Sequence, residues 1–370
     1  MHLTDLALRD FRSHADTVVR LAPGVTTFVG RNGQGKTNLV EAVAYLATLA
    51  SHRATTTAPL VRQGAASANI RAKLVRGERA ALIALELVPG KSSRAHLGKA
   101  KVKPTALLGL AKAVAFAPED LALVKGGPEL RRRYLDELLV QMRPALAGVM
   151  ADWERVNHQR AALLKSLAPL RGEERERVGQ ELVYWQEEAA RLGGRLTANR
   201  MALADDLAPL VAASYGRVAG EGWVDVDYEP TVAVTGRPEA DQVAEALLRA
   251  MRAGQTREIE RGASLFGPHR EDLALTLNGL PAKGYASHGE SWSLALALKL
   301  GAFELMRRDA DDDPILILDD VFAELDADRR EGLAKLVDGV EQVLVTAAVR
   351  GDVPEGLTGR WYRVAEGRVE

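Results

Sequence analysis

Residues 30–37 have the sequence Gly30-Arg31-Asn32-Gly33-Gln34-Gly35-Lys36-Thr37, which is typical of a phosphate-binding loop. It fits the pattern G-x-x-x-x-G-K-[ST] at every fixed position, after a strand-like run and before a helix-like run. The glycines let backbone N–H groups surround phosphate oxygens, and the start of the helix adds a positive dipole. We therefore predict an ATP site formed by these residues and Asn38. A chance glycine-rich turn before a helix is the alternative.

A second motif supplies carboxylates. Residues 315–318 are Ile-Leu-Ile-Leu, which predicts a buried strand, and Asp319 and Asp320 follow at its carboxyl end, where open α/β sheets bind ligands. Lys36 would place its charge on the β- and γ-phosphates, while Thr37 would ligate Mg²⁺ and Asp319 would hold that ion through water. Asp320 would accept a proton from the attacking water or orient it, so we predict Asp320, Lys36 and Asp319 as catalytic residues. The alternative is a strand followed by an acidic turn.

A third motif, Ser287-His288-Gly289-Glu290, precedes a predicted amphipathic helix. It resembles the ABC signature, usually L-S-G-G-Q, or L-S-G-G-E in SMC-like proteins, and it precedes the Asp319 strand as in that family. His288 and Ala286 depart from the pattern. The resemblance implies that Ser287, Gly289 and Glu290 bind the γ-phosphate of a nucleotide held by another head. In isolation, the same residues are a good helix N-cap.

Two further positions belong with these motifs. Glu324-Leu325-Asp326 follows the carboxylates as the D-loop does in ABC proteins, and Asp326 is also a plausible N-cap. The switch histidine that often ends the next strand is missing, and Thr346 is the only polar candidate there.

Composition narrows the class of protein. The chain has 370 residues, which suggests two domains, with a net charge of −1 and no cysteine. Disulfides and cysteine-ligated metals are excluded, and the near-neutral charge confines any nucleic-acid site to a local patch. The N-terminus lacks a signal-peptide pattern, and no apolar run approaches the roughly 18 residues of a membrane span. We therefore expect a cytoplasmic protein with no membrane partner.

The motifs lie toward the two ends of the chain, and the middle differs in character. Short β-branched and aromatic runs before residue 118 predict strands, whereas residues 130–216 are rich in Ala, Leu, Arg, Glu and Gln and predict long helices. We expect an α/β fold: an ABC/SMC-type P-loop ATPase head with an inserted short helical arm domain. Residues 1–118 together with 263–370 would form the head, and residues 119–262 the mainly helical arm (lobe II).

Two basic clusters are candidates for contacts with DNA phosphates. Between Glu86 and Glu119 there is no acidic residue, and this stretch contains Lys99, Lys101 and Lys103. The second cluster follows a Gly-Gly-Pro turn and consists of Arg131, Arg132 and Arg133. Either cluster could instead be a solvated surface, a hairpin and loop in the first case and a first helical turn in the second.

Together, these motifs resemble the RecF family of bacterial recombinational repair ATPases, and the resemblance runs nearly end to end. One hallmark combines Phe116-Ala117-Pro118-Glu119-Asp120-Leu121 with Arg131-Arg132-Arg133-Tyr134-Leu135-Asp136. A second is Gly267-Pro268-His269-Arg270-Glu271-Asp272. Neither hallmark belongs to general ABC or transporter heads, so both point to this family.

The resemblance implies an ATP-dependent homodimer, joined head to head by two ATP molecules, that binds double-stranded DNA and single-/double-strand junctions. It implies slow, DNA-stimulated hydrolysis of ATP to ADP and phosphate, and action with RecR and RecO in gap repair to load RecA onto single-stranded DNA. The alternative is a generic SMC-like or transporter-type ABC ATPase subunit, which shares the ATPase motifs. A DNA scaffold with structural ATP is a further alternative, against which the paired Asp319 and Asp320 argue.

Overall fold

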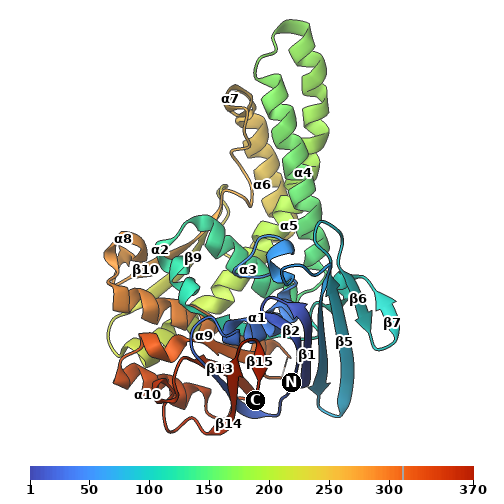
Figure 1. Ribbon diagram of the computed structural model, residues 1–370. Coiled ribbons are helices and arrows are strands. Elements are labelled where there is room, and N and C mark those ends of the chain that lie inside the picture. Colours follow the sequence, from blue (N-terminus) through green and yellow to red (C-terminus); the bar gives the residue numbers. More distant parts are fainter. Residues whose placement is uncertain (311) are drawn as a thin grey trace. The chain divides into compact units, whose positions relative to one another are not determined.

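The chain forms two compact units in a computed structural model that describes residues 1–310 and 312–370. Unit 1 contains Met1–Val124, Leu210–Trp223 and Ala286–Glu370, and unit 2 contains Lys125–Pro209 and Val224–Tyr285. The first and last thirds of the chain therefore build one α/β body, drawn in blue and red in Figure 1, while most of the middle builds the second unit.

Unit 1 is built on two six-stranded sheets. The first is antiparallel, in the spatial order β2 (His14–Arg20), β1 (His2–Phe11), β4 (Ala68–Arg76), β5 (Arg79–Leu87), β6 (Arg94–Leu97) and β7 (Ala100–Val102). The second has the order β15 (Arg368–Val369), β14 (Gly359–Ala365), β3 (Gly24–Val29), β13 (Gln342–Ala347), β12 (Ile315–Asp319) and β8 (Ala113–Phe116). All its pairings are parallel except β14–β15. Every residue of β12 and β13 is buried, as expected for central strands of a parallel sheet.

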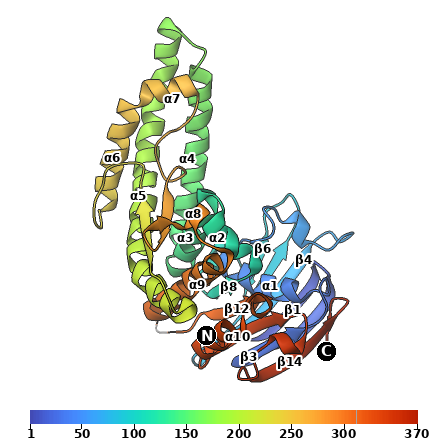
Figure 2. The same cartoon turned by 90° about the vertical axis from the view of Figure 1, so that its left-hand side faces the viewer.

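Helix α1 (Lys36–Thr48) lies between the two sheets (Figure 2). Its apolar side chains, including Leu39, Val43 and Leu46, share one cluster with Leu6 of β1 and Ile317 of β12. Burying each side chain of this size contributes about 1.5–3 kcal/mol, so this cluster fixes α1 and the loop that precedes it.

Two further helices of unit 1 follow the second unit in the sequence, α9 (His288–Ala310) and α10 (Ala327–Val337). The last turns of α5 (Gly172–Ala219) pack on α9, since a Cβ added at Gly301 would lie 2.8 Å from the Val211 side chain. The shorter helical turns are η1 (Ala58–Leu60), η2 (Pro104–Leu107), η3 (Pro118–Leu121), α2 (Ala122–Lys125), η4 (Val321–Glu324) and η5 (Arg350–Asp352). Within residues 1–310 and 312–370, no helix combines the length and the apolar character needed to cross a membrane.

Unit 2 is mainly helical, as the sequence predicts. In both views α4 (Leu146–Leu167) and the first part of α5 run side by side in opposite directions (Figures 1 and 2). Two consecutive helices, α6 (Ala240–Ala253) and α7 (Gln255–Arg261), meet at Gly254, where a Cβ would lie 2.5 Å from the Phe266 ring. The remaining elements are α3 (Pro128–Met142), the short turn α8 (Ala282–Tyr285), and a small sheet of β11 (Leu280–Pro281), β10 (Asp272–Leu277) and β9 (Val224–Glu229).

A polar network inside unit 2 joins the hallmark segments 131–136 and 267–272. The Arg131 guanidinium donates to both carboxylate oxygens of Asp272, at 2.8 and 2.7 Å. Arg200 of α5 donates in the same way to Asp136, at 2.8 Å to each oxygen, and also to the carbonyl of Pro268 at 2.8 Å. Such paired, charge-assisted bonds are strong and directional, so the two hallmark segments act together to hold α3, α5 and β10 in place.

The division into units differs from the predicted one. The prediction gave residues 119–262 to the arm, whereas unit 2 begins at Lys125, excludes Leu210–Trp223 and extends to Tyr285. Residues 263–285 were predicted in the head. They belong to unit 2 because β10 pairs with β9 over six residues and because Asp272 is bound by Arg131.

We predict that Glu258→Ala destabilises unit 2 by about 3–5 kcal/mol. Arg160 of α4 and Glu258 of α7 form an ion pair in which both side chains are fully buried, and Arg160 also donates to Ser264 Oγ at 2.6 Å. Removing Glu258 leaves a buried charge without its counter-ion. Denaturant unfolding followed by helical circular dichroism measures the loss.

The matched control is Glu245→Ala, which breaks an exposed pair with Arg249 one helix away and should change stability by about 0.5 kcal/mol or less. Equal effects of the two substitutions would contradict a structural role for the buried pair.

Candidate nucleotide site

The phosphate loop connects the carboxyl end of β3 to the start of α1, as predicted. Gly30 has no room for a side chain, because a Cβ there would lie 2.2 Å from the carbonyl oxygen of Val364. Gly35 has a φ of 106°, in the left-handed region that favours glycine. Among the described residues, no side chain caps α1, and its first turn contains no acidic residue. The positive end of the helix is therefore available to an anion.

Lys36 and Asp320 lie near each other at the mouth of the loop. Lys36 Nζ lies 3.5 Å from Asn32 Oδ1 and 3.9 Å from Asp320 Oδ1. Both distances are long for a hydrogen bond, so the buried ammonium retains most of its capacity to bind an anion. The Asp320 side chain is 30% exposed, which lets water reach its carboxylate.

Asp319 lies deeper than Asp320. Its Oδ1 atom accepts hydrogen bonds from Thr37 Oγ1 at 3.1 Å and from Thr346 Oγ1 at 2.5 Å. Burial raises the pKa of Asp319 to about 6; the bonds from Thr346 and Thr37 oppose this rise, and the neighbouring charge of Asp320 adds to it. Thr346 also accepts the backbone N–H of Asp320 at 2.9 Å, so the polar residue at the switch position contacts both acidic residues.

The oxygen atoms of Thr37 and Asp319 fit Mg²⁺. Both are hard oxygen donors and lie 3.1 Å apart, so the two residues would hold one Mg²⁺ together. In the described part of the chain, Asp319 forms no ion pair, so a divalent ion would supply the missing positive charge. Among the described residues, no group of three or more His, Cys, Asp or Glu side chains is arranged around a metal position.

Hydrogen bonds also join the phosphate loop to the hairpin of β14 and β15. Gln34 Oε1 accepts the backbone N–H of Glu366 at 2.7 Å, and the Gln34 carbonyl accepts that of Gly367 at 3.0 Å. The His14 ring lies between the carbonyl oxygens of Gly367, 2.9 Å from Nδ1, and Gly35, 3.1 Å from Nε2, and burial lowers its pKa. The sequence does not predict these contacts, because residues 14, 34 and 367 are remote from one another along the chain.

The signature segment begins α9. The backbone N–H of Ser287 donates to Glu290 Oε2 at 2.8 Å, and that of Glu290 donates to Ser287 Oγ at 3.3 Å. This reciprocal pair is a capping box, so the N-cap role considered for the segment is confirmed. Ser287 is exposed. Among the described residues, no hydrogen bond or ion pair joins Ser287 or Glu290 to the phosphate loop, and Gly289 lies against Arg329 instead.

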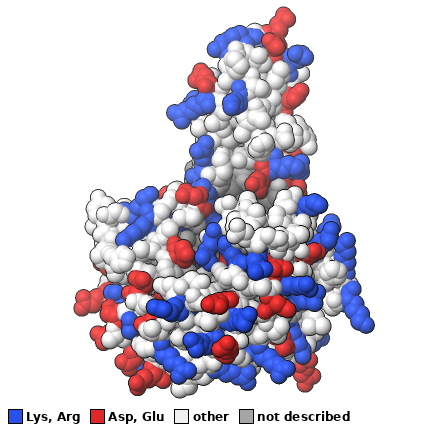
Figure 3. Space-filling model, in the orientation of Figure 1, with Lys and Arg blue, Asp and Glu red and all other residues white. Residues whose placement is uncertain are grey.

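The two predicted basic clusters have different environments. Arg131 is 6% exposed and paired with Asp272, Arg132 donates to the carbonyl of Glu271 at 2.7 Å, and Arg133 pairs with Glu137 at 2.8 Å. The other cluster lies on and beside the β6–β7 hairpin, where Figure 3 shows Lys and Arg side chains gathered at the surface, and consists of the exposed residues Lys99, Lys101 and Lys103. The hairpin cluster is therefore the one open to an external phosphate.

A glycine-lined phosphate loop, a buried carboxylate beside its threonine and an open carboxylate beside its lysine define an ATPase head of the ABC/SMC type. Residues 2–364 match the family model described as the RecF/RecN/SMC N terminal domain. The chain belongs to the RecF family of DNA replication and repair proteins. It is 54% identical to the RecF protein of Frankia alni, over 100% of this chain and 99% of that one, and 52% identical to that of Streptomyces avermitilis, over 100% of both.

Solved structures agree with this membership. A structure described as the recombination mediator protein RecF-ATPrS in the RecFOR pathway aligns with a TM-score of 0.90 at 25% identity, over 100% of this chain and 97% of that one. The Smc head domain of Pyrococcus furiosus aligns with a TM-score of 0.54 at 14% identity, over 100% and 95%, which shows a shared fold alone. Because the chain belongs to the RecF family, the transporter-type and generic SMC-like alternatives are set aside.

We predict that Asp319→Asn stabilises the metal-free protein at neutral pH. An exposed Asp has a pKa near 3.9, so the metal-free fold binds a proton more tightly than the unfolded chain does and loses stability as the pH rises from about 4 to 6. Asparagine can still accept from both threonines but carries no charge. The expected gain is roughly 2–3 kcal/mol above pH 7 and none below pH 4, seen as a difference in Tm.

Asp338→Asn, at an exposed position in the same unit, is the control and should leave the Tm nearly unchanged at both pH values. A gain for Asp319→Asn that is equally large at pH 4 and pH 8 would contradict burial of a charged carboxylate as its cause.

Proposed function

We propose that this chain is a slow ATPase that binds ATP with Mg²⁺, dimerises when ATP is bound, and binds DNA in replication and repair. The observation that carries the ATPase part is the arrangement of Lys36, Thr37, Asp319 and Asp320 around one loop mouth. It is supported by the relatives, which are described as DNA replication and repair proteins, and by a related structure described as RecF-ATP.

Each residue has a separate task in hydrolysis. The backbone N–H groups of the loop and the Lys36 ammonium bind the β- and γ-phosphates, and the Thr37 hydroxyl and Asp319 carboxylate would hold Mg²⁺. That ion would neutralise charge that develops on the phosphate oxygens. Asp320, which water can reach, orients the attacking water and accepts its proton as the oxygen bonds to the γ-phosphorus and the bond to ADP breaks.

A second copy of the chain would complete the site. The exposed Ser287 hydroxyl and the N-terminal end of α9 are suited to bind a γ-phosphate, yet the side chains of Ser287 and Glu290 accept hydrogen bonds from each other's backbone N–H groups. If two heads face each other, each signature segment binds the nucleotide held by the other. ATP then adds to the dimer interface, and the lifetime of the dimer follows hydrolysis.

For DNA we propose the β6–β7 hairpin as a contact surface, with double-stranded DNA and single-/double-strand junctions as ligands. Its lysines are exposed, whereas Arg131 is committed to Asp272. The structural relative described within the RecFOR pathway supports action with RecR and RecO, and we extend this to the loading of RecA on single-stranded DNA at gaps.

Hydrolysis measured against protein concentration tests the shared site. In the wild type, the rate per subunit should rise with concentration and be stimulated by double-stranded DNA. Ser287→Arg should reduce the rate at least tenfold while ATP binding is kept, because the arginine fills the place of the partner's γ-phosphate. Ser166→Arg, an equal change at an exposed serine of α4, should have little effect. A hydrolysis rate per subunit that changes neither with protein concentration nor with Ser287→Arg would contradict a site shared between subunits.

Charge reversal tests the hairpin. Lys99→Glu, Lys101→Glu and Lys103→Glu together should weaken binding of a DNA duplex at least tenfold at low salt. Each lost phosphate contact should lower the slope of log K against log salt by about 0.9. A control triple at exposed positions elsewhere in unit 1, Arg308→Glu, Lys335→Glu and Arg360→Glu, carries the same change in net charge. Equal losses in the two triples would assign the effect to net charge and contradict the hairpin as the contact surface.

A further inference from the structure

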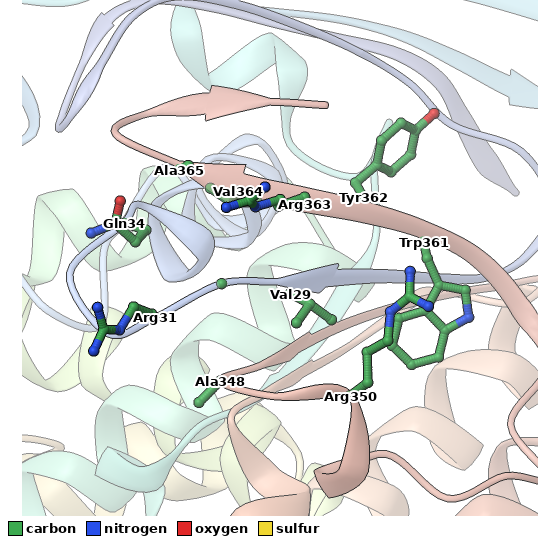
Figure 4. A pocket seen from close by; sticks show the side chains of 11 residues that line it. Val29, Arg31, Gln34, Ala348, Arg350, Trp361, Tyr362, Arg363, Val364 and Ala365 are labelled. Atoms are coloured by element: carbon green, nitrogen blue, oxygen red, sulfur yellow. The ribbon is translucent and has the colours of Figure 1, made fainter.

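A separate cavity lies beside the phosphate loop in unit 1 (Figure 4). It has a volume of about 440 Å³, within the range of small-molecule sites. It shares Gly30, Arg31 and Gln34 with the loop, but Lys36, Thr37 and Asp319 do not line it. Its other wall is formed by β14 and by the segment that follows β13. The cavity is therefore distinct from the place where the catalytic residues meet.

The alternation of β14 explains the character of this wall. Tyr362 and Val364 face the core, where the Tyr362 ring stacks on Phe28 at 5.8 Å and Val364 is buried. Trp361 and Arg363 alternate with these two residues along the strand, and all four residues line the cavity. A tryptophan that is only partly buried is thus placed at one end of the cavity, as Figure 4 shows.

The cavity is strongly cationic. Three exposed arginines line it, and none of its lining residues is acidic. In the described part of the chain, no ion pair with a carboxylate is formed by any of the three, which are Arg31, Arg350 and Arg363. The central carbon of the Arg350 guanidinium lies over the Trp361 ring, 5.3 Å from its centroid, so a cation and an aromatic ring adjoin at this end of the cavity.

We propose that this cavity binds one nucleotide unit, with its base against Trp361 and Arg350 and its phosphate at Arg31 and Arg363. Uncompensated guanidinium groups select an anion, and a flat ring with an adjoining guanidinium selects an aromatic group. A nucleotide combines the two, and proteins that hold unpaired strands use the same pairing of cations and aromatic rings. The unit comes from an unpaired DNA strand or from a free nucleotide.

Binding to the full-length chain tests the proposal, with the phosphate loop saturated by Mg²⁺ and a non-hydrolysable ATP analogue. The probes are a labelled oligothymidylate of about ten nucleotides and thymidine monophosphate. Trp361→Leu should weaken binding of a probe by roughly five- to 150-fold, the range expected for loss of one stacked base. Arg350→Glu with Arg363→Glu should abolish most binding and lower the salt slope for the oligonucleotide by about 1.4.

Matched controls separate this site from general effects of charge and folding. Arg360→Glu changes the same strand outside the cavity lining, and Trp223→Leu removes an exposed tryptophan from elsewhere in unit 1; neither should weaken binding. All variants should bind the ATP analogue as the wild type does, because none replaces a residue of the catalytic arrangement.

The outcomes discriminate between sources and can overturn the proposal. Weakened binding of both probes identifies a free nucleotide as a ligand, whereas weakened binding of the oligonucleotide alone identifies an unpaired strand. The proposal fails if the wild type binds neither probe, if the cavity variants bind as the wild type does, or if the controls lose as much. Those failures leave the proposed ATPase intact, because its readouts are hydrolysis, concentration dependence and duplex binding.

Discussion

The arrangement of the head depends on one buried carboxylate. Asp319 ends the inner strand β12 of the parallel sheet and accepts hydrogen bonds from hydroxyl groups at the start of α1 and on the adjacent strand β13. A buried charge is costly unless it is bonded or neutralised, and two neutral hydroxyl groups compensate this one only in part. The same bonds that align the loop with the sheet therefore create a place where a cation is favoured. The Asp319 carboxylate therefore both holds the loop against the sheet and favours a bound cation.

The head motifs could be predicted because their geometry is local. A phosphate loop is set by glycines and a lysine within eight residues, and an apolar run followed by two aspartates gives a buried strand with an acidic end. The α/β class and RecF-family membership, both predicted, are confirmed by the structural and family comparisons. The exact limits of the units could not be predicted, because they depend on long-range pairings such as Arg131 with Asp272, which are 141 residues apart.

The two basic clusters also could not be told apart from the sequence alone. In sequence, Arg131–Arg133 and the lysines of residues 99–103 are equal candidates for phosphate contact. The fold distinguishes them, because Arg131 is paired with Asp272, Arg132 with the carbonyl of Glu271 and Arg133 with Glu137, while the lysines are exposed on and beside a hairpin. Charge alone does not reveal whether a side chain is already bound, as Arg131 is to Asp272 inside unit 2.

The contacts between the phosphate loop and the β14–β15 hairpin affect how the chain can fold during its synthesis. The loop is near residue 30, yet its neighbouring strands β13 and β14 and its contacts with Glu366 and Gly367 lie more than three hundred residues later in the chain. On the ribosome, the emerging chain holds the glycines and the lysine long before it holds the support that aligns them. The sheet that supports the loop can therefore close only after more than three hundred further residues have been added, and pairings of such long sequence separation form slowly.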